Sequence, residues 1–186
     1  MPHLIIFASG SGSNAENIIN YFKNSKKGQV VCVLSNNRKA GVFARCKRLG
    51  VPCYYYPKED FITGKMLTYL KTTADYIILA GFLLKIPPVI VAAFPNRILN
   101  IHPAMLPKYG GKGMYGMHVH KAVKENNEQK TGITIHFVNE HYDEGNIIFQ
   151  SSIQIAPTDS PEDIAQKVRA LEHEHFPGVI EEIIAN

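Results

Sequence analysis

Five short apolar runs recur along the first 103 residues of the chain, and each ends at a turn or a break in the pattern. The runs occupy residues 4–8, 29–35, 53–56, 76–80 and 98–103. Continuous apolar runs of this length are typical of strands that are buried on both faces of a parallel sheet. The pattern therefore predicts five strands in the interior of the fold.

Between these runs, apolar residues recur every three or four positions, as they do on the buried face of a helix. The spacing predicts helices at residues 15–22, 40–49, 64–73 and 87–94. Gly50 follows the second of them, where glycine commonly ends a helix. Strands that alternate with helices in this way predict an α/β fold, a doubly wound, mostly parallel, Rossmann-like sheet with helices on both faces.

Beyond residue 103 the pattern changes to a long connection followed by an antiparallel hairpin. Residues 103–117 are rich in glycine, and loops of this length in compact domains are usually functional or mobile. A short helix is predicted at 118–125. Alternation of apolar and polar positions at 132–138, and a partner strand at 146–155, predict a C-terminal hairpin around a turn at 139–145.

The final segment carries strong helix signals. Ser160 precedes a proline and two acidic residues, which is the usual arrangement of an N-cap, a first helical position and a first turn. We expect this final helix to run to about His175 and Pro177 to end or kink it. Apolar residues beyond Pro177 continue the same face.

Composition narrows the class of protein. Without an internal repeat or a linker, residues 1–186 are expected to form a single domain. The net charge of +4 comes from scattered basic residues, which favours a small anionic ligand over a nucleic acid. No apolar run is long enough to cross a membrane, and the first residues lack the features of a signal peptide. The three cysteines show no CxxC spacing, so a reduced, cytoplasmic protein is expected.

Asn100 and His102 are the polar residues of an otherwise apolar strand that stops at Pro103. Residues two apart on a strand point to the same side, so an amide and an imidazole should emerge together at the carboxyl end of this strand. Buried polar groups cost free energy unless they are hydrogen-bonded, so folding alone does not explain the pair. Two adjacent donors aimed at one point are typical of a site that stabilises an oxyanion.

A glycine-rich turn, SGSGSN at residues 9–14, joins the first strand to the first helix. A strand, a glycine-rich turn and a helix in this order direct backbone N–H groups at an anion. The turn has neither the lysine of a P-loop nor the third glycine of a dinucleotide fingerprint, so a single phosphate suits it best. A plain tight turn is an equally good interpretation of this stretch alone.

Two carboxylates each allow two interpretations. Asp143 is either a turn-forming residue, the more common role, or the group that orients His102, as a carboxylate does beside an imidazole in acyl-transfer sites. Glu172 lies on the edge of the apolar stripe of the last helix, where spacing alone favours exposure to solvent. The alternative is a carboxylate that faces a cleft and binds sugar hydroxyl groups.

The histidine pairs His118-x-His120 and His173-x-His175 raise the question of a metal site. Neither pair has the spacing of a helical zinc motif, and residues two apart on a helix face different ways. We therefore expect no metal. His3 and His136 fall in predicted strands and are expected to be surface residues or hydrogen-bonded core residues.

Several stretches together resemble the folate-dependent formyltransferases. Asn100-Ile-His-Pro-Ala-Met-Leu-Pro107 is similar to the Asn-x-His-Pro segment of that family, and residues 132–148 resemble its second signature, whose aspartate falls at Asp143. The SGSGSN turn, the LAGF segment at 79–82 and Glu172 with its following histidine resemble members that act on glycinamide ribonucleotide. The resemblance covers nearly the whole chain.

The resemblance implies that a formyl group passes from the co-substrate 10-formyltetrahydrofolate to the primary amine of glycinamide ribonucleotide in purine biosynthesis, through a tetrahedral oxyanion intermediate. It implies three catalytic residues, Asn100, His102 and Asp143. The first two would stabilise the oxyanion with His102 protonated, and Asp143 would keep His102 charged and help to move a proton through water. Only small-molecule partners are expected, with a monomer or a weak homodimer.

The same resemblance implies the substrate contacts. The phosphate and ribose of the ribonucleotide would lie at Ser11, Gly12, Ser13, Asn14 and Glu172. The folate would lie at Leu79, Phe82, Leu83, Leu84, Ile86, Ile98, Val138, Asn139, Glu140 and His141. The loop between Tyr109 and His118 is several residues longer than the family pattern, which leaves the contacts made there open.

Three other assignments remain. Family members whose formyl acceptor is water or a charged tRNA carry an additional N-terminal or C-terminal domain, and neither is expected in a chain of this length. A nucleotide-binding α/β module without catalysis, inferred from the glycine-rich turn alone, would make Asn100, His102 and Asp143 dispensable.

Overall fold

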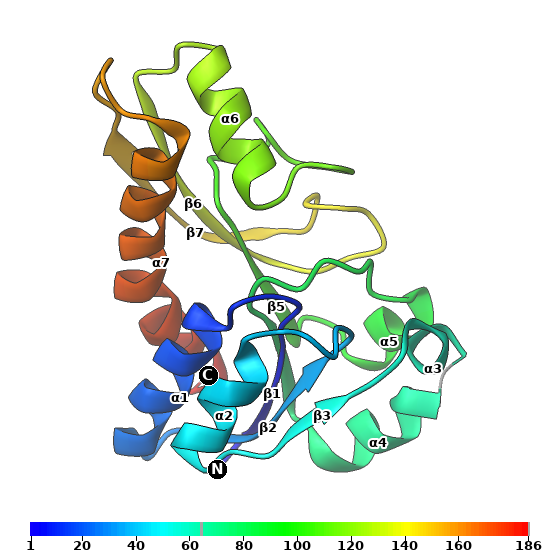
Figure 1. Cartoon of the computed structure of the whole chain (residues 1–186). Coiled ribbons are helices and arrows are strands. Elements are labelled where there is room, and N and C mark those ends of the chain that lie inside the picture. Colours follow the sequence, from blue (N-terminus) through cyan, green and yellow to red (C-terminus); the bar gives the residue numbers. More distant parts are fainter. Residues whose placement is uncertain (64, 186) are drawn as a thin grey trace.

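The apolar runs form strands of one sheet in the computed structural model, which describes residues 1–63 and 65–185 (Figure 1). The strands are β1 (His3–Phe7), β2 (Gln29–Ser35), β3 (Cys53–Tyr55), β4 (Tyr76–Leu79), β5 (Ile98–His102), β6 (Lys130–Phe137) and β7 (Ile147–Gln154). Their order across the sheet is β3-β2-β1-β4-β5-β6-β7. The first five run parallel, whereas β6 is antiparallel to both β5 and β7. The predicted mostly parallel α/β sheet with a C-terminal hairpin is therefore confirmed.

Helices cover both faces of this sheet. They are α1 (Ser13–Asn24), α2 (Val42–Leu49), α3 (Lys58–Ile62), α4 (Lys65–Thr73), α5 (Pro88–Ala93), α6 (Met117–Glu125) and α7 (Pro161–Ile184). One apolar cluster contains buried residues of α1, α2, α6 and α7, and a second contains those of α3, α4 and α5. The short helix α3 was not predicted, and Gly64, where the next helix was predicted to begin, lies outside the described residues.

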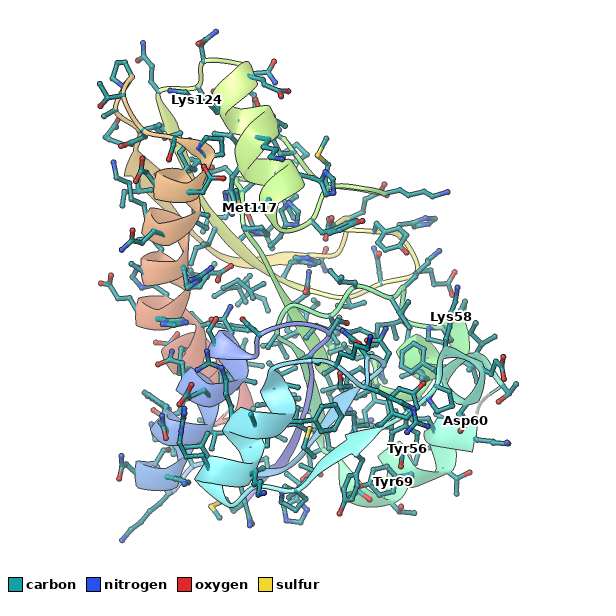
Figure 2. All side chains as sticks on the ribbon, in the orientation of Figure 1. Tyr56, Lys58, Asp60, Tyr69, Met117 and Lys124 are labelled. Carbon is teal, nitrogen blue, oxygen red and sulfur yellow. The ribbon has the colours of Figure 1, made fainter. Side chains whose placement is uncertain are left out.

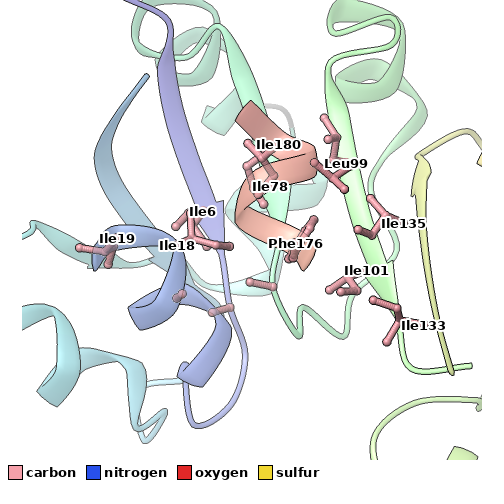
Figure 3. Packing of buried hydrophobic residues seen from close by; sticks show 14 of the residues in the cluster. Ile6, Ile18, Ile19, Ile78, Leu99, Ile101, Ile133, Ile135, Phe176 and Ile180 are labelled. Atoms are coloured by element: carbon pink, nitrogen blue, oxygen red, sulfur yellow. The ribbon is translucent and has the colours of Figure 1, made fainter. Parts of the chain in front are cut away.

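Strand β1 shows why the apolar runs lack alternation. Leu4 and Ile6 belong to the first cluster, and Ile5 and Phe7 belong to the second. Successive side chains of a strand point to opposite faces, so each strand of this kind must be apolar throughout. Figure 3 shows the first cluster, in which helix α7 lies against the inner strands of the sheet.

The last helix differs from its prediction at one end. Ser160 is the N-cap, and its side chain accepts the N–H of Asp163, as the sequence signals predict. The predicted end near His175 is wrong, because α7 continues through Pro177 to Ile184.

A side chain of α1 explains how the helix passes its proline. Pro177 has no N–H to donate to the carbonyl of His173, four residues earlier. The Nδ2 of Asn17 donates to that carbonyl at 2.8 Å instead. Burial of Ile180 and Ile184 beyond the proline adds apolar packing that favours the continued helix.

The sheet topology defines where a ligand would bind. The strand order reverses between β1 and β4, and in such sheets ligands bind at the carboxyl ends of the strands that flank this point. The SGSGSN turn follows β1, Gly81 and Phe82 follow β4, and β5 beside it ends at His102. Three of the predicted site segments therefore meet at one edge of the sheet. Within residues 1–63 and 65–185, no helix is both long and apolar enough to cross a membrane.

Candidate active site

A cleft of about 650 Å³ lies at this edge of the sheet. Its walls come from the turn after β1, the segment after β4, the end of β5, the loop before α6, the hairpin turn and the middle of α7. Small-molecule sites in proteins usually enclose roughly 300–1,000 Å³. The size of this cleft therefore suits small-molecule ligands.

All the predicted site residues except Ile98 and Glu140 line this cleft. Ile98 is 1% exposed because it lies at the start of β5, deeper in the core than Asn100 on the same face of the strand. Glu140 is exposed at the hairpin turn, outside the cleft wall. The structure does not bring these two predicted folate contacts to the site.

Asn100 is held by its partner across the sheet. It lies opposite His136 in the pairing of β5 with β6, and its Nδ2 is 3.0 Å from Nε2 of His136. The Nδ1 of His136 is 2.9 Å from the carbonyl oxygen of Phe137. Because a carbonyl only accepts, Nδ1 carries the proton and Nε2 accepts one N–H of Asn100. The second N–H of this amide has no acceptor among the described residues, and the side chain lines the cleft.

His102 is 3% exposed, and its two ring nitrogens face different groups. Nε2 lies 2.7 Å from the main-chain carbonyl oxygen of Tyr109 and donates to it, whereas Nδ1 lies 3.5 Å from Oδ2 of Asp143. Burial lowers the pKa of His102 below its usual value, although Asp143 and the Tyr109 carbonyl act in the opposite direction. The lowered pKa favours the neutral form of His102, whereas the resemblance implies a protonated imidazole.

Asp143 has a left-handed φ of 56° in the hairpin turn. Its Oδ2 accepts the N–H of Gly111 at 2.9 Å, and its Oδ1 lies 3.6 Å from Nε2 of His136. Burial raises the pKa of Asp143, but its other surroundings, including the hydrogen bond from the Gly111 N–H, hold it below its usual value. Asp143 is thus an ionised carboxylate beside two imidazoles, and not only a turn residue.

Gly145 completes this turn because no other residue fits. A Cβ at this position would lie 1.7 Å from a carbonyl oxygen of β6. The close approach of the two backbones places Asp143 over the end of β5. The spacing Asp-x-Gly therefore has a steric cause.

Thr134 attaches the loop after β5 to the sheet. Its Oγ1 accepts the N–H of Leu106 at 3.0 Å and donates to the carbonyl of Ala104 at 2.7 Å. Thr134 also lies opposite His102 in the strand pairing. These bonds fix the start of the loop beside His102. The remainder of the loop leads to Met117, which lines the cleft at the first turn of α6, whereas Lys124 lies at the outer end of that helix (Figure 2).

The N-terminus of α1 presents backbone N–H groups to the cleft. Gly12 is the N-cap with a φ of 78°, and no side chain caps the helix. A Cβ on Gly12 would lie 2.5 Å from Val42, so only glycine fits. The Nε of Arg45 donates to the carbonyl of Ser11 at 2.8 Å and supports the turn. An uncapped helix start of this kind favours a bound anion.

Glu172 of α7 faces the cleft beside this turn. Its Oε2 accepts a hydrogen bond from Nδ2 of Asn14 at 2.8 Å. Burial raises the pKa of Glu172 above its usual value, and the Asn14 amide and the charge of Arg169 partly oppose the shift. Oδ1 of Asn14 is buried without a hydrogen-bond partner among the described residues. The exposed helix edge that spacing alone favours is therefore not observed, and two oxygens are available here for hydroxyl donors.

His120, His136 and Arg169 also line the cleft but were not predicted as site residues. Burial, followed by the positive charge of Arg169, lowers the pKa of His120 to about 4, so this imidazole is neutral. Arg169 lies three residues before Glu172, a helical spacing that places both on one face and was visible in the sequence. The role of His136 depends on the register of β5 and β6, which the sequence does not reveal.

No group of three or more His, Cys, Asp or Glu side chains that could hold a metal ion is found in residues 1–63 and 65–185. The polar residues of the cleft instead include amides, imidazoles, basic side chains and two separate carboxylates. The donor set is suited to hydrogen bonding and proton transfer.

Comparisons with known proteins agree on one family. The chain matches the sequence profile of the family described as formyl transferase over residues 3–180. The phosphoribosylglycinamide formyltransferase of Escherichia coli (strain K12) is 32% identical over 185 residues, which cover 96% of this chain and 85% of that protein. The chloroplastic protein of the same name from Arabidopsis thaliana is 40% identical over 185 residues, which cover 95% of this chain. The chain spans 63% of that protein and 59% of the one from Vigna unguiculata.

Solved structures show the same fold. The glycinamide ribonucleotide transformylase 1 from Geobacillus kaustophilus is similar with a TM-score of 0.90 and 30% identity, covering 99% of both chains. The phosphoribosylglycinamide formyltransferase from Bacillus halodurans has a TM-score of 0.88 and 31% identity, covering 99% of this chain and 96% of that one. The agreement extends over the strands and helices that surround the cleft.

Proposed function

This chain belongs to the formyl transferase family, and from that membership we propose that it transfers the formyl group of 10-formyltetrahydrofolate to the amine of glycinamide ribonucleotide in purine biosynthesis. The printed names of the relatives support this acceptor. The uncapped start of α1 supports a phosphorylated substrate.

One observation carries the proposal: an amide, an imidazole and a carboxylate meet at one point of the cleft. Asn100 offers a free N–H, and Nδ1 of His102 offers a lone pair. The ionised Asp143 lies 3.5 Å from that nitrogen. Formyl transfer needs a donor for the oxyanion, an acceptor for the proton of the amine, and a charge that stabilises the resulting imidazolium.

The proposed step moves one proton and exchanges one C–N bond for another. The amine nitrogen attacks the formyl carbon, and the electrons of the carbonyl bond move to oxygen, where Asn100 donates its free N–H. The amine proton passes to Nδ1 of His102, directly or through water. When the intermediate collapses, the C=O bond re-forms, the bond from the formyl carbon to N10 of the folate breaks, and N10 takes the proton from His102.

We infer a role for the neutral form of His102 that differs from the one the resemblance implies. Its positive charge arises during the reaction, when the oxyanion and Asp143 both lie beside it. Attraction that exists only in the transition state lowers the barrier without strengthening the binding of the substrates. Asp143 therefore acts on the charge of His102 after the proton has been transferred.

The two substrates would occupy opposite ends of the cleft. The phosphate would bind the backbone of Ser11 to Asn14, and the ribose hydroxyls would donate to Glu172 and to the unpaired Oδ1 of Asn14. The folate would lie along the apolar wall. The cleft residues proposed for the folate are Leu79, Phe82, Leu83, Leu84, Ile86, Val138, Asn139 and His141.

The test is to mix the purified chain with 10-formyltetrahydrofolate and to follow the folate absorbance with and without glycinamide ribonucleotide. We expect turnover only when the ribonucleotide is present, and loss of turnover in a folded His102→Ala variant. Turnover without the ribonucleotide would instead indicate hydrolysis by water, which the same three groups could catalyse. Absence of turnover in both mixtures would favour a binding module.

The compartment and the oligomeric state are separate proposals. The three cysteines are free thiols, which supports a reducing compartment such as the cytoplasm. The plant relatives are named chloroplastic. We propose a monomer or weak homodimer, and light scattering during size-exclusion chromatography would measure the mass.

A further inference from the structure

Tyr109 supports the imidazole of His102 from a main-chain conformation that tyrosine rarely adopts. Its carbonyl oxygen accepts the Nε2–H of His102 at 2.7 Å. Its φ is 58°, in the left-handed region that is unfavourable for any residue with a Cβ. The carbonyl therefore points at His102 only while other contacts hold Tyr109 in this conformation.

The phenol of Tyr109 makes such a contact outside the cleft. Its hydroxyl donates to Oε1 of Glu128 at 2.9 Å, and Nζ of Lys108 donates to the same oxygen at 3.0 Å. The bond from Lys108 and, to a smaller extent, the bond from Tyr109 lower the pKa of Glu128. The carboxylate therefore stays ionised near neutral pH. The N–H of Glu128 bonds to the carbonyl of Val123 in α6, so the anchor belongs to the body of the fold.

The position of Tyr109 along the loop makes this anchor important. The segment before it is attached to the sheet through Leu106 and Thr134. The segment after it contains Gly110 and Gly111, which restrict the backbone little. The tyrosine ring also packs against the first apolar cluster. Tyr109 thus lies between the part of the loop that is bonded to the sheet and its glycine-rich continuation.

His102 is under two opposing influences on the position of its proton. The Tyr109 carbonyl favours a proton on Nε2, whereas the Asp143 carboxylate favours one on Nδ1. His136 and His120 also lie within electrostatic range of the ring. If the Tyr109 carbonyl moved away, a proton would settle on Nδ1 toward Asp143, and the lone pair needed in the cleft would be lost.

We propose that Tyr109 and Glu128 are positioning residues that act together. The bond from the phenol to Glu128 keeps the Tyr109 carbonyl on Nε2 of His102, and so leaves Nδ1 free to exchange a proton with the substrates. Glu128 does not line the cleft, so it acts only through Tyr109. The effect of this pair on turnover rests on the proposed formyl transfer. Its effect on the proton of His102 does not require substrates.

The experiment is nitrogen NMR of the full chain labelled at histidine, without substrates, in the wild type and in Tyr109→Phe and Glu128→Ala. A His102→Gln variant assigns the signals. We expect the wild type to hold the Nε2–H form of His102, and both variants to gain the Nδ1–H form. The titration midpoint of His102 should fall in both, because the Tyr109 carbonyl raises its pKa. In the formyl-transfer assay, kcat should fall about tenfold with both KM values nearly unchanged.

Two variants provide matched controls. Tyr21→Phe removes another bond from a phenol to a glutamate, the one to Glu181 at 3.1 Å, at a place outside the cleft. Lys108→Met leaves the bond between Tyr109 and Glu128 in place. Both controls should keep the proton of His102 on Nε2.

An unchanged proton position and midpoint of His102 in Glu128→Ala would overturn the inference, even if Tyr109→Phe failed to fold. The same shift in Tyr21→Phe as in Tyr109→Phe would overturn it as well. A displaced proton in a protein that transfers no formyl group would support the positioning role and refute the proposed function. The two failures are therefore distinguishable.

Discussion

Replacing Asp143 by asparagine tests whether the charge of this residue, rather than its place in the hairpin turn, serves the reaction. Asparagine keeps the shape of the side chain and an oxygen that can accept the Gly111 N–H. It removes the negative charge beside His102 and His136. The variant should therefore fold and lose turnover.

The distance between the charges sets the size of the effect. Oδ2 of Asp143 lies 3.5 Å from Nδ1 of His102. Opposite unit charges at this separation attract by about 5 kcal/mol at an effective dielectric constant of about 20, and by about half as much at twice that value. Loss of this attraction from the transition state should lower kcat by about 50- to 3,000-fold.

The assay is kcat at saturating concentrations of both substrates, with folding checked by circular dichroism. Asp159→Asn is the matched control, because Asp159 also accepts a backbone N–H, that of Ala156, and lies outside the cleft. It should leave kcat unchanged. A folded Asp143→Asn variant whose kcat stays within about fivefold of the wild type would refute the electrostatic argument.

Three further substitutions test the binding turn, the buried carboxylate and the last helix. Gly12→Ala should raise the KM for the ribonucleotide about tenfold or more, because the new Cβ would lie 2.5 Å from a valine of α2. The KM for the folate should be unchanged, and separate measurements of the two KM values check this. Glu172→Gln should weaken the binding of the ribonucleotide. It should also raise the melting temperature, measured by calorimetry, and the rise should be larger at about pH 8 than at about pH 4. Burial raises the pKa of Glu172 in the folded state, so its charge costs stability above that pKa and not below the unfolded one. Asn17→Ala should lower the free energy of unfolding in urea by about 1–3 kcal/mol, and by less in a Pro177→Ala background, where residue 177 supplies an N–H to the carbonyl of His173.

The strands could be predicted because burial on both faces leaves a local pattern. Their apolar runs do not depend on which strand pairs with which. The length of α7 could not be predicted in the same way, since Pro177 signals a helix end unless a distant donor satisfies the carbonyl of His173. That donor is Asn17, which lies 156 residues earlier in the chain.

The proposed catalytic pair, Asn100 and His102, shows a similar division. Asn100 and His102 are recognisable because they are polar in an apolar strand, and a spacing of two places them on one side. The same spacing puts Ile98 on that side, but Ile98 lies at the start of the strand, where it is buried in the core and does not reach the cleft. His136 needed the pairing register of β5 with β6, which only the fold supplies.

Asp143 and Glu172 are different again. Spacing alone gave each a common structural role, and only the resemblance to a family placed both in the cleft. In the structure, Asp143 is ionised between two imidazoles, and Glu172 is partly buried against Asn14. Neither environment can be derived from local sequence, because each is built from segments far apart in the chain.

The central claim is that the cleft passes a formyl group from one substrate to the amine of another. The most direct measurement is the fate of a carbon-13 label in the formyl group of 10-formyltetrahydrofolate, followed by NMR in the presence of the chain and glycinamide ribonucleotide. The account predicts that the label appears as the N-formyl group of the ribonucleotide, in equal amount to the folate consumed. Label released as formate, or label that remains on the folate, would contradict it.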